Sequence, residues 1–271
     1  VQFEDERDYQ FAMTNLTTAL AADEVWFNSR FHLESFLNAL DRFLRKMPDH
    51  PPLERIAEIE EKSSVHSPGV EPFPVRGPRE AGPLRILWSS RWEHDKNPED
   101  FFQALLMLKS KGVDFRLSIL GESFRNSPKV FQEMKEEFKN RIDRWAFLES
   151  PEEYRRALME TDVYVSTANH EFFGIGAVEA MLAGNYPLLP PRLSYPELLE
   201  VTNPSDSSEF LYDGTPQSLS DSLARIDVKL REGTLWDEDA QGLHGRISRF
   251  EWPQLVGDMD ESLQKICDKG K

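Results

Sequence analysis

Cysteine is almost absent from this chain of 271 residues, in which Cys267 stands alone. A single cysteine excludes an internal disulfide and any cysteine-rich metal site. The sequence also lacks a run of about 18 uncharged apolar residues, the length that a membrane helix needs. No basic segment followed by an apolar one opens the chain, as a secretion signal would. These absences favour a cytoplasmic protein that neither spans a membrane nor is secreted.

Net positive charge is absent as well, because 48 Asp and Glu outnumber 32 Lys and Arg and give a formal charge of -16. Such a chain lacks the broad basic surface with which proteins usually grip nucleic acid. The balance does not exclude a small anionic ligand, since a few cations at the amino end of a helix suffice to hold a diphosphate. The hydrophobic fraction of 39%, with 18 Phe, is enough to build real cores.

The chain begins without Met, and Val1 leads directly toward a helical pattern that starts at Tyr9. We therefore expect a piece of a longer protein whose first domain lacks its opening strands. A stretch over residues 47–79 is rich in Pro, Glu and Ser, which is typical of a linker. We predict a partial first domain with its linker over residues 1–76, and a second domain with a closing helix over residues 77–271.

Short apolar runs alternate with amphipathic stretches after Pro83, as in βα units wound around a parallel sheet. Asn97 and Pro98 form a typical helix start, a capping residue followed by proline. The predicted fold class is therefore α/β. The expected strands are residues 84–88, 115–120, 145–148, 163–166 and 186–189, and the expected helices are residues 98–108, 129–140, 151–159 and 177–183.

Open parallel sheets bind ligands beyond the carboxyl ends of their strands, so the loops after these strands are the places to search. The loop after the first strand places two cations, Arg91 and Lys96, five positions apart in front of a helix. Such a pair is suited to clamp a diphosphate. The alternative is an ordinary solvated loop in which the two cations pair with Glu93 and Asp95.

The segment after the fourth strand is the most informative part of the chain. Gly174 and Gly176 permit a close backbone approach at a helix start, where free N–H groups favour a phosphate. Glu171 and Glu179 stand eight positions apart, and carboxylates accept hydrogen bonds from sugar hydroxyls. The alternative for Glu179 is an acid in the first helical turn that the helix dipole favours.

This segment resembles the retaining glycosyltransferases of the GT-B type. Seven residues separate Glu171 from Glu179, with a Phe-Gly between them and Glu-Ala-Met-x-Ala-Gly at the end. The resemblance implies a complete Rossmann-like donor domain and a first domain that is only partly present. It also implies that Arg91 and Lys96 hold the donor pyrophosphate, that Glu171 contacts the transferred sugar, and that Glu179 contacts the ribose. Catalysis would depend on Glu171, Arg91 and Lys96.

Further donor contacts follow from the same resemblance. The backbone of Phe172, Phe173 and Gly174 would contact the phosphate and sugar, and the stretch from Trp145 to Leu148 would lie near the nucleobase.

His170 and Ser90 are additional candidates for phosphate or sugar contacts, since Ser90 stands in the first ligand loop and His170 in the second. The His and acidic residues form no ligand pattern, and the family relies on Arg, Lys and helix ends. We therefore expect no metal and no cofactor besides the nucleotide sugar.

A closer resemblance links the chain to the tRNA-queuosine mannosyltransferase group. Its motifs are Arg-Trp-Glu-His-Asp-Lys-Asn-Pro-Glu at residues 91–99, His-Glu-Phe-Phe-Gly at residues 170–174 and Tyr-Pro-Glu at residues 195–197. Residues 28–50 resemble this group too. The resemblance implies GDP-mannose as the donor and the queuosine of tRNA-Asp as the acceptor.

Two alternatives to this reading stay open. One is a retaining glycosyltransferase that uses another nucleotide sugar, such as UDP-glucose, on a glycan or lipid. The other is a module that binds a nucleotide sugar without catalysis. A dinucleotide-dependent oxidoreductase is disfavoured, because no Gly-x-Gly-x-x-Gly follows the first strand. The sequence assigns no oligomeric state.

Overall fold

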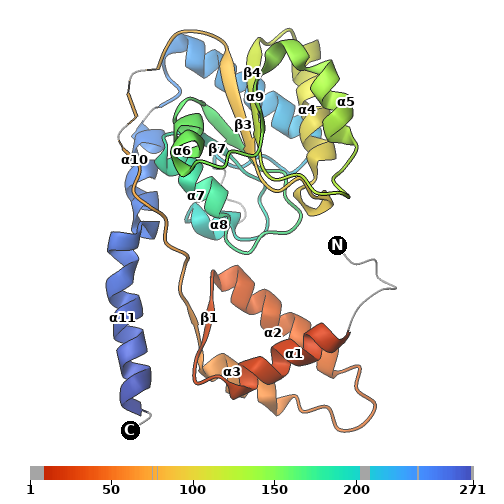
Figure 1. Ribbon diagram of the computed structural model, residues 1–271, viewed down its shortest axis with the longest axis vertical. Helices are drawn as coiled ribbons and strands as arrows, with labels where there is room; N and C mark the ends of the chain where they lie inside the picture. The colour runs from red at the N-terminus through yellow and green to blue at the C-terminus, as the bar shows by residue number, and fades with distance from the viewer. Residues whose placement is uncertain (1–8, 75, 78, 202–207, 237, 270–271) are drawn as a thin grey trace. The chain divides into compact units, whose positions relative to one another are not determined.

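The computed structural model describes residues 9–74, 76–77, 79–201, 208–236 and 238–269. The chain divides into two compact units, one of Val1–Gly69 with Trp252–Lys271 and the other of Val70–Glu251 (Figure 1). The last helix therefore groups with the first unit, whereas the sequence pattern attached it to the second domain. The domain boundary after residue 76 stays a prediction.

The first unit contains a small parallel sheet with helices packed around it. Strand β1 (Val25–Phe27) pairs with β2 (Ser63–Val65). The helices of this unit are α1 (Tyr9–Ala21), α2 (Arg30–Leu44), α3 (Glu54–Glu61) and α11 (Trp252–Lys269). A core of buried side chains joins the first three helices: Leu16, Ala19, Leu40, Leu44 and Ile59.

The proline-rich stretch is not irregular throughout, so the prediction of a linker is wrong for residues 54–65, where α3 and β2 lie. Prolines cluster on either side of this segment, at residues 48–52 and 68–78. The segment itself keeps all its N–H donors and is free to form regular structure. Ile56 and Ile59 recur at helical spacing and turn one side of α3 toward the core.

Five parallel strands in the order β5-β4-β3-β6-β7 form the sheet of the second unit. The strands are β3 (Leu84–Ser89), β4 (Phe115–Leu120), β5 (Ile142–Ala146), β6 (Val163–Val165) and β7 (Tyr186–Leu188). Strand β3 pairs with β4 from Leu84 opposite Phe115 to Ser89 opposite Leu120. Because all strands are parallel, their carboxyl ends lie along one edge of the sheet.

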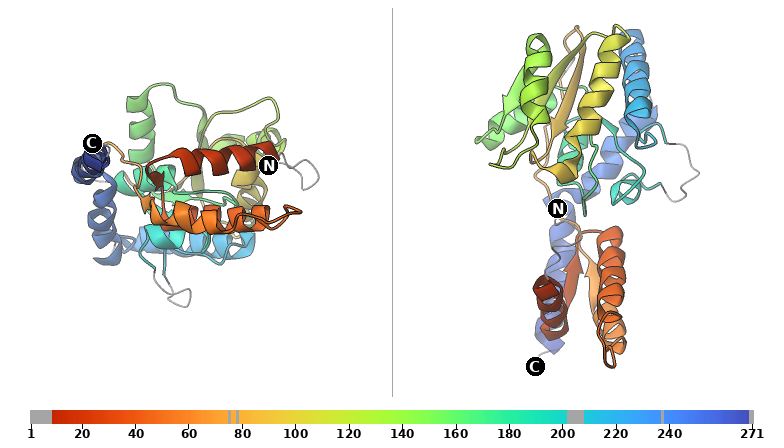
Figure 2. Two further views of the ribbon diagram at one scale, coloured as in Figure 1. Left: turned by 90° about the horizontal axis from the view of Figure 1, so that it is seen from below. Right: turned by 90° about the vertical axis from the view of Figure 1, so that its right-hand side faces the viewer.

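Helices cover both faces of this sheet (Figures 1 and 2). They are α4 (Pro98–Ser110), α5 (Val130–Glu137), α6 (Pro151–Met159), α7 (Ile175–Leu182), α8 (Tyr195–Leu198), α9 (Pro216–Glu232) and α10 (Glu238–Ile247), with short 3₁₀ turns η2 (His94–Lys96), η3 (Lys139–Arg141) and η4 (Ser248–Phe250). Helix α4 packs against α5 and α9, and α7 packs against α6 and α10. The crossover connections are right-handed and run in opposite directions along the sheet. They therefore place the helices around α4 on one face and the helices around α7 on the other.

The central strand β3 is buried on both faces, and Leu84, Ile86 and Leu87 are inaccessible to solvent. A nearly continuous apolar run is what a parallel strand covered on both sides requires. The fully buried Phe101 and Phe102 of α4 lie in the same core as these strand residues. This is why the strand and the helix were both visible in the sequence.

The predicted strands agree with the observed ones to within one residue, except for β5. That strand begins at Ile142, three residues before the predicted start at Trp145. It lies at the edge of the sheet, where β4 is its neighbour among the described strands. The polar Asp143 and Arg144 interrupt the apolar run on which the prediction rested, and an edge strand tolerates such residues.

Helix α4 begins at Pro98, as predicted, but Asn97 does not cap it in the expected way. Asn97 lies in the left-handed region with φ of 51°, and its side chain makes no capping hydrogen bond to the helix backbone. Its amide instead donates to the Asp100 carboxylate at 2.7 Å.

A buried carboxylate, Asp162, joins the segment before β3 to the start of β6. Its Oδ1 accepts hydrogen bonds from Arg79 Nε at 2.8 Å and Arg76 Nη2 at 3.1 Å. Its Oδ2 accepts from Arg79 Nη2 at 2.8 Å and from the backbone N–H of Arg85 at 2.9 Å. Both oxygens are thus satisfied although the side chain is inaccessible to solvent.

We expect Asp162→Ala to lower the free energy of unfolding by about 3–5 kcal/mol, because it leaves two guanidinium groups, each only 16% exposed, without their carboxylate. Urea denaturation of the chain measures this loss. Asp114→Ala is the matched control, since it removes an Asp–Arg pair whose carboxylate is 77% exposed and should cost far less. Equal losses in the two variants would contradict the role given to Asp162.

Candidate functional site

A cavity of about 430 Å³ opens at the carboxyl edge of the sheet in the second unit. Its wall is formed by the segments that follow β3, β4, β5 and β6, together with residues of α6 and α7. This is the edge at which open parallel sheets bind ligands. The predicted residues that line it are Ser90, Arg91, Lys96, Leu148, Glu171 and Glu179.

Lys96 joins the two predicted ligand loops. Its side chain is only 9% exposed, and its Nζ donates to the His170 carbonyl at 2.8 Å and to Glu171 Oε2 at 3.2 Å. Asp95 Oδ2 lies 3.6 Å from the same ammonium group. Lys96 thus has the partner Asp95 that the ordinary-loop alternative predicted, but it is buried and not solvated as that alternative required.

Arg91 has a different environment. Its side chain is 58% exposed, and its Nη1 lies 3.1 Å from Glu93 Oε2. This is the exposed pair that the alternative reading predicted, and such pairs are weak. Arg91 still lines the cavity, so an anionic ligand there would compete with Glu93 for its guanidinium group.

Glu179 reaches the cavity from α7 and is held by a short chain of hydroxyl groups. The Tyr154 hydroxyl donates to Glu179 Oε2 at 3.0 Å, and Ser89 Oγ lies 3.3 Å from that hydroxyl. Burial raises the pKa of Glu179, while the hydrogen bond from Tyr154 and the charge of Arg155 act in the opposite direction. Burial and the charge of Glu179 raise the pKa of Tyr154, which therefore remains a hydrogen-bond donor.

Two glycines give this edge its backbone shape. Gly121 follows β4 with φ of 148°, and a Cβ there would lie 1.8 Å from the carbonyl oxygen of Ser90. Only glycine lets the loop after β3 pass so close to β4. Gly174 precedes α7 with φ of 93°, and a Cβ there would lie 3.0 Å from the Tyr195 ring.

Several predicted residues are not on the cavity wall. Phe173 is buried and packs edge-on against Phe250, with ring centroids 5.2 Å apart. His170 is 61% exposed and packs against the Phe172 ring. Their contacts with a ligand, and those of Gly174, stay predictions.

Trp145 turns away from the cavity into an aromatic cluster. Its ring stacks on Phe102 at 5.7 Å and meets the edges of Trp92 and Phe131. Leu148, from the same predicted segment, does line the cavity, together with Phe147, which is 58% exposed. A place near a nucleobase therefore stays a prediction for Leu148, whereas the packing of Trp145 argues against it.

Several residues of the wall were not predicted from the sequence, among them Tyr154, Tyr164 and Ile175. Tyr154 lies in an amphipathic helix and Tyr164 in an apolar strand, so each has the spacing of a core residue. No local motif distinguishes them. Ile175 is the one with a visible signal, since it stands between the two glycines that had been singled out.

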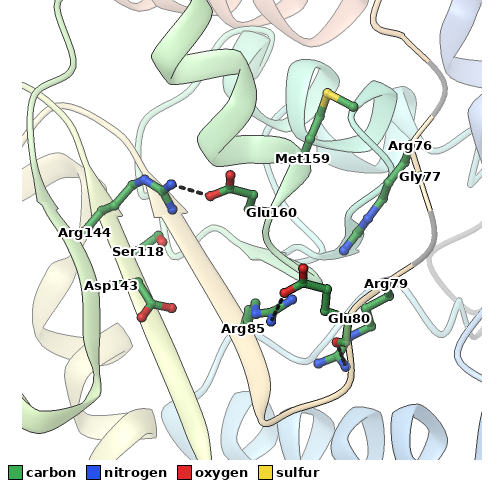
Figure 3. Close-up of a pocket in the computed structure, with 10 residues that line it drawn as sticks. All are labelled: Arg76, Gly77, Arg79, Glu80, Arg85, Ser118, Asp143, Arg144, Met159 and Glu160. Carbon is green, nitrogen blue, oxygen red and sulfur yellow. Dashed lines mark hydrogen bonds and ion pairs between the residues drawn. The ribbon is translucent and has the colours of Figure 1, made fainter.

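A larger cavity, of about 620 Å³, lies toward the opposite end of the strands (Figure 3). Its wall carries many charges, but these are paired, either with one another or with residues just behind the wall. Figure 3 shows Arg144 turned toward Glu160 and Arg85 turned toward Glu80. Arg76 and Arg79, also on this wall, bind the buried Asp162. These pairs give the larger cavity a structural role, so we place the functional site at the carboxyl edge.

Among the described residues, no group of three or more His, Cys, Asp or Glu side chains is placed to hold a metal ion. None of the helices in the described ranges combines the length and the hydrophobicity of a bilayer-spanning segment.

Comparison with protein families gives two matches. Residues 1–70 match the family described as "tRNA-queuosine alpha-mannosyltransferase N-terminal", and residues 72–226 match "Glycosyl transferases group 1".

Two curated proteins and one solved structure illustrate the similarity. The tRNA-queuosine alpha-mannosyltransferase of Drosophila melanogaster is 36% identical over 217 residues, which cover 76% of this chain and 57% of that protein. The GDP-mannose:cellobiosyl-diphosphopolyprenol alpha-mannosyltransferase of Xanthomonas campestris is 23% identical over 189 residues, which cover 69% and 48%. The chain thus spans less than two thirds of either relative. A sucrose-phosphate synthase from Thermosynechococcus elongatus superposes with a TM-score of 0.71 at 16% identity, covering 99% of this chain and 65% of that one.

We expect Tyr154→Phe to raise the pKa of Glu179 further, because it removes the hydrogen bond that stabilises the carboxylate. NMR titration of the glutamate side-chain carbons measures this pKa. Because the pKa of Glu179 is higher in the folded than in the unfolded state, its protonated carboxyl stabilises the fold at pH values below the unfolded-state pKa. This contribution to the free energy of unfolding is lost as the pH rises through the folded-state pKa. Tyr212→Phe is the control, since its hydroxyl donates to the Ser166 carbonyl and not to Glu179. An unchanged or lower pKa in Tyr154→Phe would refute the arrangement.

Proposed function

Since the chain belongs to the group 1 glycosyl transferases and has the α/β fold of the GT-B type, we propose that it transfers a hexose from a nucleotide sugar with retention at the anomeric carbon. The observation that carries this proposal is the cavity at the carboxyl edge. There Arg91 and Lys96 from one loop line the same wall as Glu171 and Glu179 from the segment after β6. Cations for a diphosphate and carboxylates for hydroxyls are the groups that a nucleotide sugar requires.

The contacts within the cavity support one orientation of the donor. Lys96 lies against Glu171, so a diphosphate held by Lys96 would bring the attached sugar beside that carboxylate. Glu179 is held by Tyr154 from α6, and Leu148 and Phe147 line the wall beyond β5. In this proposal Glu179 accepts from the ribose hydroxyls, and the nucleobase lies toward Phe147 and Leu148.

The proposed chemistry follows from where charge develops. The bond between the anomeric carbon and the diphosphate breaks, and the acceptor hydroxyl attacks from the same face of the sugar. The leaving diphosphate gains negative charge, which Arg91 and Lys96 stabilise electrostatically. Lys96 is the better placed of the two, because its burial and its fixed partners position the ammonium group before the reaction.

Mannose from GDP-mannose is the donor that we propose. The fly relative is named for the transfer of mannose, and the name of the Xanthomonas relative includes GDP-mannose. Both similarities cover most of the segment in which the cavity lies. The geometry of the cavity by itself is suited to any nucleotide sugar.

The queuosine of tRNA-Asp is the acceptor that we propose, and a cytoplasmic location accompanies it. Residues 1–70 match a family described by that modification, and the fly relative carries the same name. The net charge of -16 means that an RNA acceptor would have to be held through local contacts.

The first test is calorimetric titration of the chain with GDP, GDP-mannose, UDP and UDP-glucose, each with and without magnesium. We expect tighter binding of the guanosine compounds and no requirement for magnesium, because Arg91 and Lys96 supply the positive charge. Tighter binding of the uridine compounds would overturn the proposed donor and acceptor while keeping a transferase. Absence of binding by all four would overturn the donor site itself.

The second test removes one charge at a time from the cavity. We expect Arg91→Ala and Glu179→Gln each to weaken nucleotide-sugar binding by about 1–3 kcal/mol, the scale of a hydrogen bond to a charged group. Arg144→Ala and Glu160→Gln are matched controls, since they remove the same charges from the other cavity. Unchanged affinity in both cavity variants, or equal losses in the controls, would refute the site assignment.

A further inference from the structure

Tyr164 brings a polar group to the cavity from the middle of the sheet. It lies in β6, between Leu87 of β3 and Pro187 of β7, and only 3% of the residue is exposed. It nevertheless lines the cavity at the carboxyl edge. A Cβ on Gly176, in the first turn of α7, would lie 3.6 Å from its hydroxyl oxygen. The hydroxyl therefore lies beside the amino end of α7.

This hydroxyl makes no hydrogen bond to any of the residues that the structure describes. The neighbouring tyrosines differ in this respect: Tyr154 donates to Glu179, Tyr195 pairs with Ser166 Oγ at 2.6 Å, and Tyr212 donates to the Ser166 carbonyl at 2.9 Å. The hydroxyl oxygen is not enclosed by protein, because Tyr164 lines the cavity and its oxygen is not among the buried atoms without a partner. Phenylalanine would fill the same space in the sheet, so packing alone does not call for a hydroxyl here. Packing does not account for a hydroxyl at this position, whereas a hydrogen bond to a ligand in the cavity does.

The surroundings of Tyr164 determine what it offers to a ligand. Burial raises the pKa of Tyr164 well above its ordinary value, and Tyr195, Glu171, Tyr154 and Glu179 act in the same direction. The group is therefore a neutral hydroxyl that donates a hydrogen bond. An acceptor-only ligand group such as a phosphate oxygen is its natural partner, because a neutral hydroxyl supplies the hydrogen that such a group lacks.

We propose that the Tyr164 hydroxyl donates a hydrogen bond to an oxygen of the donor diphosphate. This inference rests on the proposed function, in which the diphosphate runs between the sugar beside Glu171 and the ribose beside Glu179. Tyr164 lines the same cavity as both carboxylates and lies next to Gly176, where α7 presents its free N–H groups. A donor held rigidly by the sheet would stabilise the charge that the diphosphate gains as it leaves.

The test compares Tyr164→Phe with the unmodified chain in titrations with GDP and guanosine, and with UDP and uridine in parallel. We expect the diphosphate that binds to lose affinity by about tenfold or more, the scale of a hydrogen bond to a charged group. Binding of the matching nucleoside should not change. The melting temperature should stay about the same, since the variant removes a hydroxyl that faces the cavity and has no partner among the described residues.

Tyr212→Phe is the matched control, because it removes a buried hydroxyl that does have a partner. It should lower the melting temperature and leave diphosphate affinity unchanged. Unaltered diphosphate binding in Tyr164→Phe, an equal loss for the nucleoside, or a lower melting temperature would overturn the role of Tyr164 alone. If the unmodified chain binds neither diphosphate, the proposed function fails and this inference fails with it.

Discussion

The order of the strands is the constraint on which the rest of the second unit depends. Strand β3 lies between β4 and β6, so the chain leaves β3 toward one edge of the sheet and leaves β6 toward the other. Right-handed crossovers then carry the two following segments to opposite faces, and a crevice remains between them at the carboxyl edge. Lys96 and Glu171 come from these two segments and meet at 3.2 Å. The cavity is thus a consequence of topology, and its charges are the contribution of the sequence.

Polar side chains have different environments at the two ends of the strands. Toward the amino ends, Asp162 accepts hydrogen bonds from Arg76, Arg79 and the Arg85 backbone, and the cavity there holds charges that satisfy one another. At the carboxyl edge, burial raises the pKa of Glu179, and the Tyr164 hydroxyl has no partner among the described residues. Satisfied groups stabilise the fold, whereas groups held ready for a ligand weaken it slightly, and such sites are where function concentrates.

Membership of the family and the geometry of the cavity support different parts of the functional argument. The family match and the likeness to solved structures establish the fold and the class of protein. The geometry adds which side chains line one wall, and it separates the buried Lys96 from the exposed Arg91 although both belong to one motif. The identity of the sugar and of the acceptor rests on the names of relatives and belongs to the proposal.

The sequence by itself determined where β3, β4, β6 and β7 lie along the chain, the α/β class, and the loops that carry Arg91, Lys96, Glu171 and Glu179. These features are local: apolar runs, glycines at turns and fixed spacings are all readable within about ten residues. Only the tertiary structure decided that Trp145 packs into an aromatic cluster, and that Tyr154 and Tyr164 carry their hydroxyls to the cavity. The direction of a side chain depends on strand register and on partners far away in the chain, such as Glu179 for Tyr154. An amphipathic pattern records that a residue is buried, but not whether it faces the core or a ligand.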